Sequence, residues 1–210
     1  GHNTPFLHRK SVRPHDSSEW EKAVSFGSGT YPYLIAGPQG SLLLAARSAK
    51  HEGVDLYRKS KDGAWETIHP LILKRHAQSV GYAGYNSVLQ WGPGHKRLHF
   101  ACDVYEGKTR GEIQMVVYQY SDDLGATWHR SDGTLIAGSP FPDQMDILAR
   151  DIRKRANSVA EPSVRLGGMI VDQTTGLPVV LLTEDDQPER GRASLWMPDS
   201  AGKWQEMGLR

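Results

Sequence analysis

Two side chains in the first quarter of this 210-residue chain have chemistry suited to an acidic ligand. Arg47 follows the continuous apolar run 42–46, and its guanidinium can hold a carboxylate through two parallel hydrogen bonds. Strand alternation places Arg47 on the face opposite Ala46, and the competing interpretation is a surface or inter-sheet ion pair. Tyr31 lies sixteen positions earlier, an even offset that lets both side chains share a face if the intervening turn keeps register. A phenol is a weak acid, so Tyr31 can exchange a proton with a ligand only beside positive charge; otherwise it is a packed strand aromatic.

The histidines and carboxylates do not form a metal-binding pattern. Histidines at metal-ligand spacing with a matching carboxylate are absent from the sequence, so seven histidines are interpreted as turn or strand residues: His15, His51, His69, His76, His95, His99 and His129. Asp103 and Glu106 form a carboxylate pair after a predicted strand, which either binds a cation or caps the turn. We therefore expect no cofactor and leave open a structural divalent cation with unknown ligands. Cys102 is the single cysteine, which excludes an intrachain disulfide.

The composition favours turn-rich β structure in a water-exposed protein. Gly (22) and Pro (12) make up about one residue in six, too many for a helix bundle and too few for a disordered tract. No uninterrupted apolar run reaches the roughly 18 residues of a membrane span. The net charge is +1, without the basic excess that binding to a phosphate backbone needs. We expect neither membrane nor nucleic acid as a partner.

One hairpin motif repeats along the chain. Residues 121–128 read Ser-x-Asp-x-Gly-x-Thr-Trp, and looser copies stand at 57–65 and 195–204, with a faint one at 16–20. In each of the three clearer copies, the aspartate can accept hydrogen bonds from turn amides, glycine can supply a positive φ, and tryptophan is expected to fold over the turn. The tryptophans of the three clearer copies lie farther apart than the roughly 40 to 50 residues of compact propeller repeats, which leaves room for long loops.

A second hairpin with a Pro/Gly turn precedes each of these three copies, so each unit has four strands. Tandem four-stranded antiparallel units predict an all-β fold of the β-propeller type. The blades are expected at about 31–69, 85–136 and 167–208, with 1–24 as the remainder of a preceding blade and 137–166 as an inter-blade insertion. Three blades cannot close a ring, so we expect a segment of a longer protein; the alternative is that several chains complete the ring. Residues 142–161, where apolar residues recur at i, i+3 and i+7, predict a short amphipathic helix or an ordered loop.

The motif at 121–128 resembles the Asp-box, or BNR repeat, of sialidase-like propellers. A longer likeness combines residues 1–5, 13–20, 30–35 and 40–48 and resembles the BNR-4 group, which includes ulvan lyases. The resemblance is clearest over residues 1–136. It implies a seven-bladed propeller in the complete relative, acting on an acidic polysaccharide at a uronic acid by β-elimination, and a secreted or periplasmic location.

The resemblance also implies a catalytic set of two histidines, a tyrosine and an arginine. Tyr31 and Arg47 have the family's separation of sixteen residues, and His2 after Gly1 stands where the second histidine belongs. Tyr31 is then the acid or base, while Arg47 and His2 neutralise the uronate. The first histidine belongs on sequence before Gly1. Gly1 follows no initiator methionine and no signal-peptide pattern, so we expect the natural start to be processed away or absent from this sequence.

Family propellers stack aromatic side chains on sugar rings in their loops, so a substrate subsite is expected at Tyr82, Tyr85 and Asn86, where Gly81 and Gly84 allow close approach. The alternative is a packed blade entrance. Three functions follow: an acidic-polysaccharide lyase or a fragment of one, a non-catalytic carbohydrate-binding propeller, and a sialidase-like glycoside hydrolase. The sialidase set of three arginines, an aspartate and a Tyr-Glu pair cannot be assembled from these residues. The expected partners are an acidic poly- or oligosaccharide and the remaining blades, from missing sequence or another chain.

Overall fold

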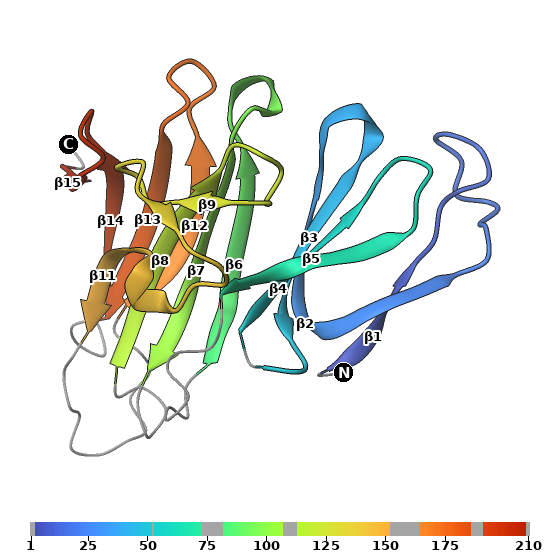
Figure 1. The fold of residues 1–210 in the computed structure, drawn as a ribbon, viewed down its shortest axis with the longest axis horizontal. Coiled ribbons are helices and arrows are strands. Elements are labelled where there is room, and N and C mark those ends of the chain that lie inside the picture. The colour runs from blue at the N-terminus through green and yellow to red at the C-terminus, as the bar shows by residue number, and fades with distance from the viewer. Residues whose placement is uncertain are drawn as a thin grey trace.

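The computed structural model describes residues 3–51, 53–72, 82–106, 113–151, 164–185 and 191–208. These residues form three antiparallel sheets that follow one another along the chain and lie side by side (Figure 1). The described part contains only short 3-10 turns as helices: η1 (Pro38–Gly40), η2 (Pro93–His95) and η3 (Pro142–Gln144). None of the described helices has the length and apolar character needed to cross a membrane.

The first sheet has the order β1-β2-β3-β4-β5. Its strands are β1 (Thr4–His8), β2 (Val24–Ala36), β3 (Leu42–Ser48), β4 (Val54–Lys59) and β5 (Trp65–Ile72). The long β2 pairs with β1 along its first half and with β3 along its second half. The Pro/Gly turn predicted between β2 and β3 is present as η1.

The second sheet has the order β10-β9-β8-β7-β6, and β11 also pairs with β8, along the edge opposite β7. Its strands are β6 (Tyr82–Trp91), β7 (Leu98–Glu106), β8 (Ile113–Ser121), β9 (Trp128–His129), β10 (Leu135–Ile136) and β11 (Asp146–Asp151). The third sheet runs β12-β13-β14-β15. Its strands are β12 (Val164–Val171), β13 (Pro178–Asp185), β14 (Gly191–Pro198) and β15 (Trp204–Met207).

The second sheet is buried on both faces because its strands alternate between two hydrophobic cores. Phe100 and Cys102 of β7 pack in the core shared with the first sheet, whereas Ala101 between them packs in the core shared with the third. In β8, Val117 and Tyr118 divide in the same way. Period-two alternation with apolar residues on both faces is typical of a strand between two layers.

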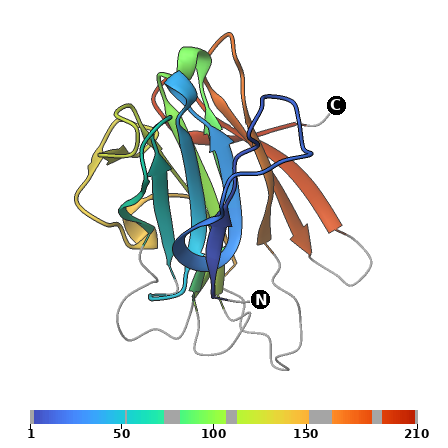
Figure 2. The same ribbon diagram turned by 90° about the vertical axis from the view of Figure 1, so that its right-hand side faces the viewer.

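The three sheets are stacked face to face and fan about their inner strands, β2, β6 and β12. β6 contacts both β2 and β12. Figure 2 shows the strands of the first two sheets nearly upright and those of the third inclined to them, as expected for twisted sheets set around an axis. This all-β arrangement confirms the propeller-type fold predicted from the repeats. The division into blades at the residues named above stays a prediction.

The helix considered for 142–161 is absent from the described part of that range. η3 is a single turn, and β11 follows it as a strand paired antiparallel with β8. Leu148 is 5% exposed and its neighbour Ile147 is 36% exposed, so burial alternates with the period of a strand. The open edge of β8 provides backbone hydrogen-bond partners for β11, whereas a short helix on its own is only marginally stable.

The Ser-x-Asp-x-Gly-x-Thr-Trp turn after β8 is a closed hydrogen-bond network. The Asp123 carboxylate accepts bonds from the Thr127 amide (2.8 Å) and hydroxyl (2.6 Å), and Ser121 Oγ accepts the Gly125 N–H at 2.8 Å. Burial acts to raise the pKa of Asp123, but these bonds hold it below its usual value. Trp128 is 1% exposed and donates its indole N–H to the Gly125 carbonyl. The turn therefore ties the outer strand β9 to β8.

Candidate functional site

A cavity of about 430 Å³ opens where the three inner strands meet. Nine residues line it, three from each strand: Tyr31, Pro32 and Tyr33 of β2, Asn86, Ser87 and Val88 of β6, and Leu166, Gly167 and Gly168 of β12. This volume lies in the range of small-ligand sites, about 300 to 1,000 Å³. We call it the inner cavity.

Each inner strand has a β-bulge at the inner cavity. The pairing register shifts between Thr30 and Tyr33 in β2, between Ala83 and Ser87 in β6, and between Leu166 and Gly168 in β12. A bulge inserts unpaired residues into one strand and redirects its side chains, and bulges concentrate next to active sites. The three irregularities therefore mark one place in the molecule.

Tyr31 stands inside the β2 bulge with an unusual backbone. Its φ is 55°, in the left-handed region that a bulky residue seldom adopts, and its side chain is 38% exposed. Such conformations cost about 1–3 kcal/mol and persist where the surrounding structure enforces them, often at functional sites. The preceding Thr30 is buried, and its hydroxyl is bonded to the backbone and side chain of Asn3. The strained tyrosine is thus presented to solvent from a fixed backbone.

Arg47 lies against Tyr31. In the β2–β3 pairing it stands opposite Thr30, and its guanidinium carbon lies 5.0 Å from the centroid of the Tyr31 ring. This is within cation–π distance. Arg47 pairs with Val54 on the other side and shares the face of β3 that turns toward the second sheet, opposite Ala46. The structure therefore brings together the tyrosine ring and the guanidinium that the sequence pairs, and Tyr31 itself lines the inner cavity.

A buried carboxylate stands behind the inner cavity and fixes Asn86. Asp103 of β7 is fully buried and accepts the Leu166 N–H at 2.6 Å and the Asn86 amide N–H at 3.1 Å. The same Asn86 amide nitrogen also lies 3.4 Å from the Leu166 carbonyl oxygen. Both partners are acceptors, so the Asn86 NH2 group faces the protein. Its side-chain oxygen makes no hydrogen bond within the described residues and is left for a ligand.

Asp103 also links the second sheet to the third. Burial raises its pKa to about 7, and the hydrogen bonds from Leu166 and Asn86 and the charge of Arg165 oppose that rise. The sequence left Asp103 available either as a cation ligand or as a turn cap. The structure instead uses one of its oxygens on Leu166 of the third sheet and the other on Asn86 of β6, in its own sheet. Glu106, its expected partner, has a side chain outside the described residues.

Sequence patterns missed several residues of the inner cavity. Ser87 is 8% exposed, and its hydroxyl has no hydrogen-bond partner among the described residues, so it can serve a ligand. A Cβ at Gly168 would meet no atom within 4 Å, which leaves the cavity wall open there. The paired glycines of β12 were a usable signal, because glycine inside a strand often marks a bulge or the close approach of a ligand.

Other predicted site residues are not placed. His2 lies outside the described residues, as do the side chains of Tyr82 and Tyr85, although both tyrosines belong to β6.

Among the histidines, His51 is a turn residue: its Nε2 bonds to Asp55 (2.8 Å) and its Nδ1 accepts the Gly53 N–H. Within the part of the chain that the structure describes, no three His, Cys, Asp or Glu side chains are arranged as a metal site.

The stacked four- to six-stranded sheets and an inner cavity at their bulges define a β-propeller-type protein. The chain matches the model of the BNR repeat-containing family over residues 1–210 and belongs to that family. It is 29% identical to the ulvan lyase of Nonlabens ulvanivorans over 86 residues, which are 40% of this chain and 18% of that protein.

The similarity to solved structures covers more of the chain than the sequence similarity to the ulvan lyase does. A polysaccharide lyase described as a PL25 ulvan lyase superposes with a TM-score of 0.70 at 15% identity, over 95% of this chain and 48% of that one. The same lyase bound to -[GlcA(1-4)Rha3S]- gives a TM-score of 0.68 at 15% identity and the same coverage. Hadza microbial sialidase Hz136 gives 0.50 at 14% identity, over 84% of this chain and 36% of that one. The chain thus spans about half the length of the solved lyase, and the likeness shows the fold. It is a BNR repeat-containing protein with weak sequence similarity to an ulvan lyase.

Proposed function

We propose that the protein is a lyase, or a segment of one, that cleaves a uronate-containing acidic polysaccharide by β-elimination, with Tyr31 and Arg47 at the cleavage point. One observation supports this most directly: the Arg47 guanidinium lies 5.0 Å from the ring of a strained, exposed tyrosine that lines the inner cavity. The weak sequence similarity to an ulvan lyase and the lyase structures that share its fold point to the same class of substrate.

In the proposed reaction, Arg47 binds the uronate carboxylate and so stabilises the negative charge that develops when the neighbouring C5 loses its proton. The phenolate oxygen of Tyr31 takes that proton. The C5–H electron pair becomes the C4=C5 double bond, the C4–O bond breaks, and the phenol returns its proton to the leaving oxygen. The Tyr31 side chain ends in the protonation state in which it began, so no other reactant is consumed.

His2 is proposed to assist Arg47 in neutralising the carboxylate, on the family resemblance alone. The Asn86 oxygen and the Ser87 hydroxyl provide an acceptor and a hydroxyl for sugar groups inside the inner cavity. A polymeric substrate cannot cross a membrane unaided, so we also propose a secreted or periplasmic location.

The test uses a polymer with the repeat -[GlcA(1-4)Rha3S]-, followed by ultraviolet absorbance and by the number of new reducing ends. A lyase produces both signals together, because each cut creates one unsaturated uronate. New reducing ends without absorbance would identify a hydrolase instead. Saturable binding of the polymer with neither signal would identify a binding propeller and refute the cleavage proposal.

A further inference from the structure

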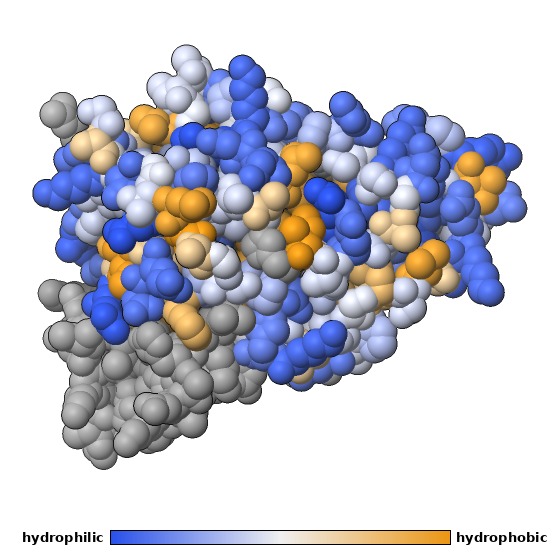
Figure 3. All heavy atoms as spheres, in the orientation of Figure 1, coloured by the Kyte–Doolittle hydropathy of each residue, from blue (hydrophilic) through white to orange (hydrophobic). Residues whose placement is uncertain are grey.

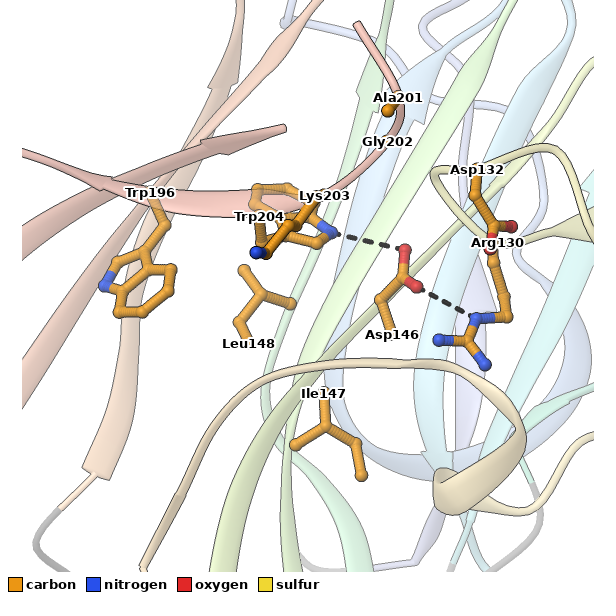
Figure 4. A pocket seen from close by; sticks show the side chains of 10 residues that line it. All are labelled: Arg130, Asp132, Asp146, Ile147, Leu148, Trp196, Ala201, Gly202, Lys203 and Trp204. Carbon is orange, nitrogen blue, oxygen red and sulfur yellow. Dashed lines mark hydrogen bonds and ion pairs between the residues drawn. The ribbon is translucent and has the colours of Figure 1, made fainter. Parts of the chain in front are cut away.

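A second cavity lies between the second and third sheets, on their outer strands (Figure 4). Its volume is about 380 Å³, and none of its lining residues belongs to the inner cavity. We call it the outer cavity. Its lining comes from the β9–β10 turn, β11, β14 and the turn into β15: Arg130, Asp132, Asp146, Ile147, Leu148, Trp196, Ala201, Gly202, Lys203 and Trp204. Figure 3 shows that apolar groups are scattered among hydrophilic ones on the face of the molecule that it presents.

A buried carboxylate fixes the shape of the outer cavity. Asp146 is 5% exposed and accepts three hydrogen bonds, from Arg130 Nε (3.1 Å), the Ser131 N–H (2.7 Å) and the Trp204 indole N–H (3.2 Å). These bonds join β11 of the second sheet to β15 of the third. Ser131 also donates its hydroxyl to the Gly202 carbonyl. Arg130 and Trp204 are therefore held in place before any ligand arrives, which lowers the entropy cost of binding.

The same contacts leave binding groups facing the outer cavity. Arg130 uses only Nε on Asp146 among the described residues, and its side chain is 41% exposed. The Lys203 ammonium makes no hydrogen bond within the described chain, whereas its backbone N–H donates to the Asp199 carboxylate and its carbonyl accepts the Asp199 N–H. Figure 4 shows Arg130 on one side of Asp146 and Lys203 on the other, beside the indole rings. Trp196 is half-buried and donates its indole N–H to Ser194 Oγ, which orients the ring.

We propose that the outer cavity binds one sugar unit of an acidic glycan. An aromatic face beside fixed N–H donors suits a pyranose ring with a carboxylate or sulfate: the ring stacks on the apolar indole of Trp196 and the anionic group bonds to Arg130 and Lys203. A purely apolar ligand would use neither the Lys203 ammonium nor the remaining N–H donors of Arg130. Asp132 adds an acceptor for a sugar hydroxyl. This site would bind the polymer at a place separate from the inner cavity, and the binding does not depend on cleavage there.

The experiment is an NMR titration with a tetrasaccharide of the -[GlcA(1-4)Rha3S]- repeat, observing the tryptophan indole N–H signals. No tryptophan lines the inner cavity, so these signals report the outer one. Signals of Trp196 and Trp204, assigned with Trp196→Phe and Trp204→Phe, are expected to shift saturably. Lys203→Ala is expected to weaken this binding about tenfold. Lys22→Ala, which removes an exposed charge before β2, is the matched control and should leave binding unchanged.

Three results would overturn the proposal. The first is that the indole signals stay fixed at saturating tetrasaccharide, whether or not the amide signals of the inner cavity move. The second is that a neutral glucose tetrasaccharide shifts the indole signals equally well. The third is that Lys203→Ala and Lys22→Ala weaken binding by the same factor. Because the titration needs no turnover, absence of cleavage in the ultraviolet assay refutes the proposed function without affecting this one.

Discussion

Asp103 determines, at the scale of single residues, which atom of Asn86 the inner cavity presents. In its ionised form, above about pH 7, Asp103 can only accept, so the Asn86 NH2 group turns toward it and the amide oxygen faces the ligand. In Asp103→Asn the new amide still accepts the Leu166 N–H but presents its own NH2 group to Asn86. The Asn86 amide must then rotate, and the inner cavity gains a donor where it had an acceptor.

We therefore expect Asp103→Asn to weaken oligosaccharide binding in the inner cavity about tenfold. Calorimetry on Asp103→Asn, Asn86→Ala and the double variant checks this. If Asp103 acts through Asn86, the double variant binds no more weakly than Asn86→Ala. Losses that add would show that the two residues act separately.

Two buried groups give the stability opposite dependences on pH. Burial and the charge of Arg97 lower the pKa of His99 to about 4, so its contribution is complete above about 6.5 and is lost as pH falls toward 4. Burial raises the pKa of Asp103 to about 7 from 3.8, so its contribution is complete at low pH and is lost as pH rises toward 7. The two slopes oppose one another between about pH 4 and 6.5.

Asp103→Asn removes the second slope and leaves the first. We expect its unfolding free energy to fall more steeply on acidification from about pH 6.5 to about pH 4.5 than that of the unchanged protein, as measured by urea unfolding. His99→Gln should fall less steeply. Parallel curves for all three proteins would show that neither group titrates as described.

The bulge of β2 is the element that positions Tyr31. Beyond the bulge Tyr33 pairs with Ala45, and before it Thr30 pairs with Arg47, so β2 has one more residue than β3 between these pairs. Deleting Pro32 removes the extra residue. Regular pairing then sets Tyr31 opposite Ala46 and turns its side chain to the other face of the sheet.

The Pro32 deletion is expected to reduce turnover at least a hundredfold while the chain stays folded. Relief of the positive φ at Tyr31 should leave the unfolding free energy unchanged or raise it by about 1 kcal/mol. Turnover and urea unfolding are measured on the same sample, with Pro32→Ala as the control that keeps the bulge. A deletion variant that unfolds less cooperatively but keeps turnover would contradict this role for the bulge.

The sequence predicted elements well where a local pattern decides them. Glycine and proline turns, two-residue alternation and the Asp123 turn each act over fewer than about ten residues, and the hairpins follow from them. β11 was not predictable, because Leu148 fits both a helical and a strand spacing and the choice depends on the distant open edge of β8.

At the scale of the whole molecule, the inner cavity exists only because three sheets stack. Tyr31 and Arg47 could be paired from their spacing and the family resemblance, since both belong to one hairpin. Ser87 and Gly168 could not be assigned to the same cavity from the sequence. They reach it from the second and third sheets, across contacts that no local pattern encodes. The Asp103 bond to Leu166 is likewise a contact between sheets.

The first and third sheets carry apolar groups on the faces that turn away from the second sheet. The second sheet is covered on both faces, whereas the far face of the first carries the stacked rings of Phe26 and Trp65, and Ile170 on the third is 66% exposed. Further sheets packed on these faces would continue the fan, in agreement with a solved lyase chain about twice as long.

Tyr31→Phe gives the most direct test of the proton transfer assigned to the inner cavity. It removes one oxygen and keeps the ring that Arg47 contacts. We expect acidic-oligosaccharide binding to change less than about twofold and formation of unsaturated uronate to fall more than a hundredfold. A Tyr31→Phe protein that still forms unsaturated uronate at the original rate would contradict the assignment.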